Sequence, residues 1–294
     1  MMNSSKNTVL VTGALGLLGR YLCPILTRSG YNVYATARRN VPRDTKNGDI
    51  ILVDLSFNNF IEKLPPKIDI IIHLAQSSNF RNFPNQAVDV FNVNIQSTAL
   101  LLDYATSVGA KKFIYASSGG VYGKGSSAFN ELEPLLSSND LGFYLGSKAC
   151  GEILVQSYSQ QIETTIIRPF FIYGVGQKRS MLLPRLFDSI VKGSPIRLSG
   201  SQGLRLNPIH AYDAAEAILA ATTITKKPIY NLAGPKTYSL KDICNLIGNF
   251  LGIQPIFENI NSEDDDLLGD IAAMSEDLIT PIRKLEDYLS DLRI

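Results

Sequence analysis

The stretch TVLVTGALGLLGR, residues 8–20, constrains the fold more than any other part of the chain. An apolar, β-branched run leads directly into Gly13, Gly16 and Gly19, which recur at every third residue, and a leucine-rich pattern with helical spacing follows. Such a strand, turn and helix form a cradle for nucleotide phosphates, because glycine lets the backbone approach the diphosphate and a helix N-terminus attracts anions. We therefore expect a bound dinucleotide here, rather than a glycine turn without a ligand.

Apolar runs alternate with helical patterns over the first 170 residues. Runs without polar alternation indicate strands that are buried on both faces of a parallel sheet. Strands are predicted at 8–12, 32–37, 50–54, 69–74, 112–117 and 164–168, and helices at 17–29, 86–108 and 141–160. This alternation predicts an α/β fold with a doubly wound parallel Rossmann sheet, in a dinucleotide-binding domain over residues 1–168.

After Pro169 the chain becomes richer in glycine, proline and arginine. Helices are predicted at 181–192, 211–222 and 239–251, and a short strand at 228–232. Residues 169–294 are expected to form a smaller, mixed C-terminal part that binds the substrate and closes over the cofactor. The acidic run Asp264–Asp266 is interpreted as a solvated loop.

Composition excludes several classes of function. The 28 basic and 27 acidic side chains leave a net charge of +1, which argues against a nucleic-acid-binding surface. The N-terminus has no apolar signal core, and no apolar run reaches the roughly 18 residues of a membrane span, so we expect a soluble, cytoplasmic protein. Cys23, Cys150 and Cys244 are scattered, as expected for reduced thiols, and the two histidines, His73 and His210, form no Cys/His cluster, so no metal site is predicted.

Tyr144 and Lys148 are the second informative pair. They lie four residues apart at the start of a predicted helix and so face the same side. A free tyrosine has a pKa near 10, and a neighbouring ammonium is expected to lower it, which makes the phenol suited to exchanging a proton with an alcohol or a ketone. Alone, the pair could be an ordinary surface pair. Its place after a strand ending in Ser117-Ser118, downstream of a nucleotide-binding turn, favours catalysis.

The chain resembles the extended short-chain dehydrogenases/reductases, also called the NAD-dependent epimerase/dehydratase family, over nearly its whole length. The resemblance is carried by several short segments that follow one another in the family's order. The segments that carry the resemblance are Gly13-x-x-Gly16-x-x-Gly19, Asp54-Leu55, His73-Leu74-Ala75, Asn94…Thr98, Ser118-Gly-Gly-Val-Tyr-Gly123, Tyr144-x-x-x-Lys148, Arg168-Pro169…Tyr173-Gly174, Asn207-Pro-Ile-His210 and the strand-like 230–234. The last two imply that segments near 205–233 return to the dinucleotide-binding domain.

The resemblance implies a role for each of the three catalytic candidates. Tyr144 would be the acid/base, Lys148 would lower the tyrosine's pKa and hold the nicotinamide ribose, and Ser118 would hydrogen-bond the substrate oxygen. Asp54 and Leu55 would contact the adenine, and Leu74 and Ala75 would line the diphosphate and ribose path. Asn94 is interpreted as structural, and His73 as a packed strand residue rather than a base.

The choice of dinucleotide can be argued from charge. NAD-binding relatives of this fold usually place an acidic residue near the end of the second strand, where this chain reads Thr36-Ala37-Arg38-Arg39. Two guanidinium groups suit a ribose 2′-phosphate, which favours NADP, with NAD as the alternative. The candidate cofactor-binding residues are Gly13, Gly16, Leu17, Leu18, Gly19, Arg38, Arg39, Asp54, Leu55, Leu74, Ala75, Gln76, Ser117, Tyr144, Lys148 and Phe171.

Family comparison narrows the reaction. Gly119 and Gly120 occupy the places where 4,6-dehydratases of the family carry an Asp and a Glu, and a Cys/His pair typical of 3,5-epimerase/reductases is missing. A 4-ketoreductase of a nucleotide-activated, deoxy sugar is therefore favoured over a 4-epimerase. Arg205 matches an arginine that relatives place on the substrate diphosphate, and Phe171 replaces a family Asn that helps hold the substrate. The candidate substrate-binding residues are Ser118, Gly119, Tyr144, Phe171 and Arg205.

Two readings of other classes stay open. The same fold serves non-catalytic proteins that hold a dinucleotide as a sensor, and a reductase could act on a carbonyl compound without a nucleotide. The intact set of Ser118, Tyr144 and Lys148 favours an enzyme. The resemblance also implies a homodimer formed through helices 86–108 and 141–160.

Overall fold

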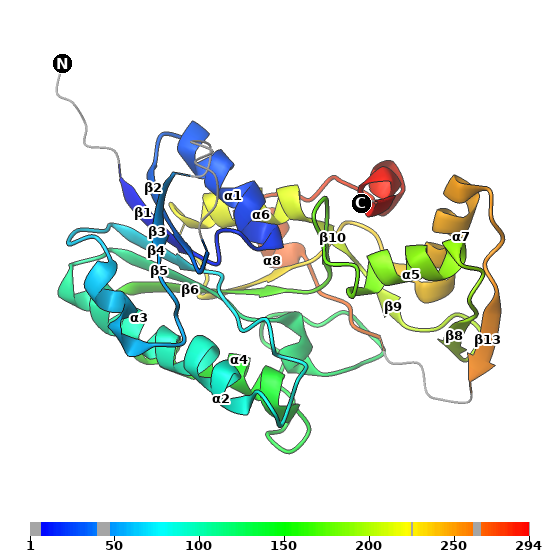
Figure 1. Ribbon diagram of the computed structural model, residues 1–294, viewed down its shortest axis with the longest axis horizontal. Helices are drawn as coiled ribbons and strands as arrows, with labels where there is room; N and C mark the ends of the chain where they lie inside the picture. Colours follow the sequence, from blue (N-terminus) through cyan, green and yellow to red (C-terminus); the bar gives the residue numbers. More distant parts are fainter. Residues whose placement is uncertain (1–6, 40–47, 225, 261–265, 294) are drawn as a thin grey trace.

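The computed structural model describes residues 7–39, 48–224, 226–260 and 266–293. Its centre is a seven-stranded sheet in the order β11-β6-β5-β4-β1-β2-β3, in which every paired neighbour is parallel (Figure 1). The strands are β1 (Thr8–Thr12), β2 (Asn32–Ala37), β3 (Asp49–Leu52), β4 (Ile70–His73), β5 (Lys112–Ala116), β6 (Glu163–Pro169) and β11 (Ile229–Leu232). The predicted Rossmann sheet is confirmed.

Alternating residues of the strands face the two layers of helices. Val9 and Val11 of β1 pack with α1 (Leu17–Arg28) and α6 (Ala211–Ala221) on one face, and Leu10 packs with the opposite layer. That opposite layer holds α2 (Ala87–Phe91), α3 (Ser97–Ser107) and α4 (Gly142–Ser157), and Figure 1 shows it below the sheet. Chain order reverses between β1 and β4, and a parallel sheet binds ligands at the carboxyl ends of the strands at such a point.

The predicted helix 86–108 is interrupted. A π-helical turn, Asn92–Gln96, separates α2 from α3. Within it the buried Asn94 accepts a hydrogen bond from the Ser77 backbone N–H at 2.9 Å and donates one to Ser147 Oγ of α4 at 2.9 Å. Asn94 thus joins the loop after β4 to the start of α4, the structural role that the sequence indicated.

The C-terminal part has its own apolar cluster. Its helices and strands are β7 (Ile172–Tyr173), α5 (Leu182–Val191), β8 (Ile196–Ser199), β9 (Arg205–Leu206), β10 (Ile209–His210), β12 (Tyr238–Ser239), α7 (Leu240–Leu251), β13 (Phe257–Ile260), α8 (Ala272–Asp277) and a 3-10 helix, Leu285–Arg293. The strands pair two by two as β10-β7, β12-β9 and β13-β8. Strands of two to four residues are too short for a recognisable alternation, which is why the sequence did not predict them. No helix among the described residues has the length and apolar character needed to cross a bilayer.

Candidate active site

The glycine turn after β1 is packed so closely that Gly13 and Gly19 have no room for a side chain and Gly16 has little. A Cβ on Gly13, whose φ is +69°, would lie 2.8 Å from the Ala75 backbone nitrogen. A Cβ on Gly16 would lie 3.0 Å from the Gly13 carbonyl oxygen, and one on Gly19 would lie 2.6 Å from Ala14. The turn therefore needs glycine for its own packing as well as for the approach of a ligand.

The turn ends at the N-terminus of α1, where no side chain caps the helix and the first turn carries no acidic residue. Backbone N–H groups at such an end attract an anion. Leu18 lies in the core with its side chain buried, and Leu17 is half-buried, so these residues would meet a phosphate through their backbone. The glycine cradle and this helix end fit the diphosphate of a dinucleotide.

Two further strand ends lie at the same carboxyl edge of the sheet. Ala75 is buried, and its backbone N–H donates to Thr12 Oγ1 at 3.2 Å, while Leu74 packs partly against the core. After β3, Leu55 is buried in the core, and the half-buried Asp54 carboxylate accepts hydrogen bonds from the Ser56 backbone and hydroxyl at 3.0 and 2.8 Å. These positions suit the diphosphate and adenine ends of the predicted dinucleotide path.

Arg38 and Arg39 follow β2 and are both exposed. Arg38 Nη2 donates to Ser78 Oγ at 3.2 Å, so its guanidinium lies beside the loop that follows β4. Both arginines are therefore at the carboxyl edge of the sheet, within the region where an adenosine ribose would lie.

Tyr144 opens α4 at this edge and is held by the loop after β4. Its hydroxyl donates to Gln76 Oε1 at 2.9 Å, and its ring packs against Phe80 with the ring centres 4.7 Å apart. The guanidinium of Arg81 lies 5.1 Å from the centre of the Phe80 ring. Arg81 also donates to the Ser180 carbonyl at 3.3 Å, which links this loop to the C-terminal part.

Lys148 does not activate Tyr144 in the way the sequence predicted. Burial raises the pKa of Tyr144 to about 12, and a hydrogen bond with Ser118 and the positive charge of Arg81 offset only part of this rise. Lys148 is buried, its ammonium donates to the Ala116 carbonyl at 2.8 Å, and burial lowers its own pKa to about 8 although Glu152 opposes this. The predicted lowering of the Tyr144 pKa is wrong, because the i, i+4 spacing carries no information on burial.

Ser117 and Ser118 follow β5 into the same region. Ser118 Oγ accepts a hydrogen bond from the Gly120 N–H at 3.2 Å and caps a 3-10 turn, Gly119–Tyr122. The buried Ser117 Oγ has no hydrogen-bond partner among the described residues. A buried hydroxyl without a partner is costly, and a bound ligand is one way in which it could be satisfied.

His73 is packed and neutral, as the sequence indicated. Thr12 Oγ1 lies 2.6 Å from His73 Nδ1, and Thr98 Oγ1 lies 3.1 Å from Nε2. Burial, assisted by the charge of Lys148, lowers the His73 pKa to about 3. The imidazole therefore links the end of β1 to the start of α3 and offers no general base.

Two of the predicted substrate contacts, Phe171 and Arg205, lie in the C-terminal part, and the solvated-loop interpretation of the neighbouring Asp266 is wrong. Phe171 is half-buried and packs against the apolar cluster there. Arg205 donates to the Asp266 carboxylate at 2.8 and 2.5 Å and to the Ser126 carbonyl at 3.1 Å. Asp266 was interpreted as part of a solvated loop, but its carboxylate is buried because it binds Arg205; Asp264 and Asp265 lie outside the described residues.

A buried ion pair near the site was missed by the sequence reasoning, which used Arg168 only as a family mark. Arg168 donates to both carboxylate oxygens of Glu152, at 3.0 and 2.6 Å, and to the Tyr122 hydroxyl at 2.6 Å. Tyr122 in turn donates to Asn231 Oδ1 at 2.9 Å. A charge at position 168 inside an apolar strand and a charge on the buried face of the helix 141–160 were the signals that could have suggested the pair.

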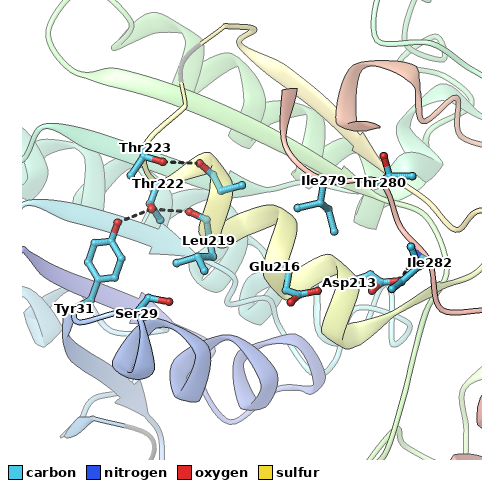
Figure 2. A pocket seen from close by; sticks show the side chains of 11 residues that line it. Ser29, Tyr31, Asp213, Glu216, Leu219, Thr222, Thr223, Ile279, Thr280 and Ile282 are labelled. Atoms are coloured by element: carbon cyan, nitrogen blue, oxygen red, sulfur yellow. Dashed lines mark hydrogen bonds between the residues drawn. The ribbon is translucent and has the colours of Figure 1, made fainter. Parts of the chain in front are cut away.

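A separate cavity of about 470 Å³ lies between α6, the end of α1 and the segment 279–282 (Figure 2). Tyr31 and Thr222 join their hydroxyls across one end, and Asp213 accepts a hydrogen bond from the Ile282 backbone at the other. None of the candidate catalytic residues lines it.

Several known proteins are similar to this chain over most of its length. A dTDP-D-glucose 4,6-dehydratase of Mus musculus is 29% identical over 248 residues, which cover 78% of this chain and 68% of the mouse protein. A dTDP-4-dehydro-6-deoxy-D-allose reductase of Streptomyces bikiniensis is 26% identical, with 83% of this chain and 81% of that protein covered. The structure of a variant UDP-glucuronic acid 4-epimerase of Bacillus cereus, with UDP-4-deoxy-4-fluoro-glucuronic acid and NAD, covers 97% of both chains with a TM-score of 0.83 and 26% identity.

The family model of the NAD dependent epimerase/dehydratase family matches residues 9–233, from the first strand of the sheet to the end of its last strand. The match includes the glycine turn, Ser118 and the Tyr144–Lys148 pair. The chain belongs to the NAD dependent epimerase/dehydratase family, and it is an enzyme of the kind that modifies nucleotide-sugars.

Proposed function

We propose that this enzyme is a 4-ketoreductase of a nucleotide-activated deoxy sugar. The observation that carries the proposal is the hydrogen bond between Tyr144 and Ser118 at the carboxyl edge of the sheet, with Lys148 one helical turn further along α4 and fixed on the Ala116 carbonyl. The relative that reduces a 4-keto sugar, by its name, matches over most of both chains, which supports the choice of reaction. We propose the same division of labour as the sequence suggested, with residues 1–168 and segments near 205–233 on the dinucleotide and the rest of 169–294 on the substrate.

The chemistry divides between cofactor and protein. A reduced nicotinamide supplies the hydride for the carbonyl carbon. Tyr144 releases its hydroxyl proton to the carbonyl oxygen, so that the ketone becomes an alcohol, and Ser118 hydrogen-bonds that oxygen. With a pKa of about 12, Tyr144 holds its proton at neutral pH and is ready to act as an acid. Lys148, fixed on the Ala116 carbonyl, would meet the nicotinamide ribose.

A dehydratase is disfavoured by packing. A Cβ on Gly119 would lie 2.5 Å from the Phe170 ring, and one on Gly120 would lie 2.9 Å from Leu145 Cδ2. An acidic side chain at position 119 would therefore require Phe170 to move. Neither glycine can transfer a proton. Of Gly119, Gly120 and Tyr144, only Tyr144 can therefore act as the acid/base.

A 4-epimerase is the second candidate, and the likeness to an epimerase structure that holds a nucleotide-sugar and NAD favours it. The two reactions differ in stoichiometry. The reductase should oxidise one NADPH for each 4-keto-6-deoxy nucleotide-sugar it consumes, which absorbance at the nicotinamide band measures. If the enzyme instead interconverted two 4-hydroxy nucleotide-sugars with no net consumption of NADPH, it would be a 4-epimerase and the proposed reductase activity would be wrong.

Arg205 is proposed to hold the substrate diphosphate with the exposed part of its guanidinium, while the same guanidinium stays bound to the Asp266 carboxylate. The charge of Asp266 opposes an anion there, and this observation keeps a substrate without a nucleotide as a rival. Nucleoside diphosphates should raise the unfolding temperature if they bind the folded protein. Thermal stability that is insensitive to UDP and dTDP would favour the rival.

We propose NADP as the preferred dinucleotide, supported by the exposed Arg38 and Arg39 at the end of β2. Replacing both by Ala should weaken NADP binding by about tenfold or more, because charge-assisted hydrogen bonds to the 2′-phosphate are lost, and should leave NAD binding nearly unchanged. Calorimetric titration of both dinucleotides measures this, with the exposed Arg197→Ala as the control. Equal losses for the two dinucleotides would contradict the proposal.

We also propose a homodimer through α2, α3 and α4. Val88 and Phe91 of α2 and Ile153 of α4 are 73%, 47% and 62% exposed, and α2 packs beside α4, so this helical layer carries apolar side chains on its outer surface. Ile153→Asp should convert a dimer into a monomer in light scattering, because it buries a charge in the interface. Leu132→Asp, at a loop residue that is 96% exposed, should not. A wild-type monomer at micromolar concentration would contradict this proposal.

A further inference from the structure

Gln76 contacts the hydroxyl of Tyr144 directly. It lies beyond the carboxyl end of β4, and its side-chain oxygen accepts the tyrosine's hydrogen bond at 2.9 Å. The family resemblance placed Gln76 only among residues that bind the cofactor. The contact with the acid/base gives it a different relation to the reaction.

The position of Gln76 is fixed from both sides. Before it, the Ala75 N–H donates to Thr12 Oγ1 at 3.2 Å, and after it, the Ser77 N–H donates to Asn94 Oδ1 at 2.9 Å. Asn94 also donates to Ser147 Oγ, three residues from Tyr144 on α4. The backbone that carries Gln76 and the helix that carries Tyr144 are thus joined through one buried amide.

The chemistry of this contact depends on the protonation of the phenol. The side-chain oxygen of glutamine only accepts hydrogen bonds, so it stabilises the protonated hydroxyl and repels a phenolate oxygen. A tyrosine that reduces a ketone must hold its proton until the substrate oxygen is in place.

We propose that Gln76 is a positioning residue that keeps the hydroxyl proton on Tyr144 and aims it, so that the enzyme meets its ketone with the proton donor loaded. The proposal rests on the proposed function only in giving Tyr144 the proton-transfer role. During the reaction the substrate carbonyl oxygen would replace the glutamine oxygen as the acceptor of the tyrosine proton.

Two other groups that face Tyr144 lower its pKa, against the effect of burial. Ser118, after β5, and Arg81, on the same loop as Gln76, lower the tyrosine pKa, while burial raises it more strongly. Tyr115 of β5 and Lys148 of α4 are themselves buried in this region. Variants at position 76 leave these groups in place, so their effects can be compared within one background.

The first test needs no substrate. A fluorinated tyrosine at position 144, whose fluorine atoms lower the phenol pKa into a range that the fold tolerates, can be titrated by ¹⁹F NMR. Gln76→Ala should lower the titration midpoint by about 0.5–1 pH unit because the acceptor is lost, and Gln76→Glu should raise it because a carboxylate disfavours a neighbouring phenolate. Gln160→Ala, an exposed glutamine before β6 at the opposite edge of the sheet, should leave it unchanged.

The second test uses the reaction. The protonated tyrosine is the active form in ketone reduction, so the alkaline limb of the kcat profile should move to lower pH in Gln76→Ala and to higher pH in Gln76→Glu. A Gln76→Ala variant with an unchanged ¹⁹F titration and weaker dinucleotide binding would overturn the proposal and return Gln76 to a cofactor contact. Opposite shifts in the ¹⁹F titration support the contact even if no nucleotide-sugar is reduced, so a failure of the proposed function is recognised separately.

Discussion

Tyr144→Phe should lower kcat for ketone reduction by about 10²–10⁴-fold, the usual contribution of a positioned proton donor. The substitution removes one hydroxyl and leaves the ring, which packs on Phe80 with centres 4.7 Å apart. The dissociation constant of the dinucleotide should stay nearly the same, because in our proposal the glycine turn and the N-terminus of α1 hold the diphosphate. Steady-state kinetics and calorimetric titration of the same preparation measure both quantities.

The matched control is Tyr158→Phe. Tyr158 directly follows α4, whose other end carries Tyr144, and packs against the sheet core. The control should keep most of the activity. A Tyr144→Phe enzyme that retained most of its turnover would show that the proton comes from elsewhere, and Tyr144 would lose its catalytic role.

Glu152→Gln should lower the free energy of unfolding by about 3–5 kcal/mol, because it leaves the buried Arg168 guanidinium without its compensating charge. Both side chains are almost completely buried, at 3% and 2% exposure, and Arg168 also donates to Tyr122. Denaturant unfolding monitored by circular dichroism measures the change. The negative charge of Glu152 also raises the pKa of Lys148, so the variant should lower that pKa further.

Glu258→Gln is the control for the ion pair. Glu258 pairs with Arg197 at 3.4 Å, and the two side chains are 53% and 73% exposed, so its loss should cost less than about 1 kcal/mol. If the two substitutions lowered the free energy of unfolding equally, the buried Arg168–Glu152 pair would contribute no more to stability than an exposed ion pair. That result would contradict the prediction.

The sheet and its glycine turn could be predicted because their signals are local. The strand over 32–37 and the helix that begins at 17 follow from runs and spacings that the chain states directly, and both appear in the structure. The break between α2 and α3 could not be read in this way. At this break Asn94 bonds Ser77 and Ser147, two partners that lie 17 and 53 residues away in the sequence.

The residues of the candidate site could be proposed from the sequence, but their electrostatics could not. Spacing brought Tyr144 and Lys148 to one side of a helix, but their pKa values follow from burial, which depends on the whole fold. In the same way, the run around Asp266 looks solvated in sequence, and only the tertiary contact with Arg205 makes its carboxylate a buried partner. Contacts between side chains that lie far apart in the chain could not be predicted from local sequence patterns.

The most direct measurement is a crystal structure of the enzyme with NADP and a nucleotide-sugar. Our account predicts the diphosphate of NADP over Gly13 and Gly16 at the start of α1, and the Tyr144 hydroxyl within hydrogen-bond distance of the sugar C4 oxygen, beside the nicotinamide ring. A dinucleotide bound away from the glycine turn, or a Tyr144 hydroxyl that reaches neither the sugar nor the nicotinamide ribose, would contradict it.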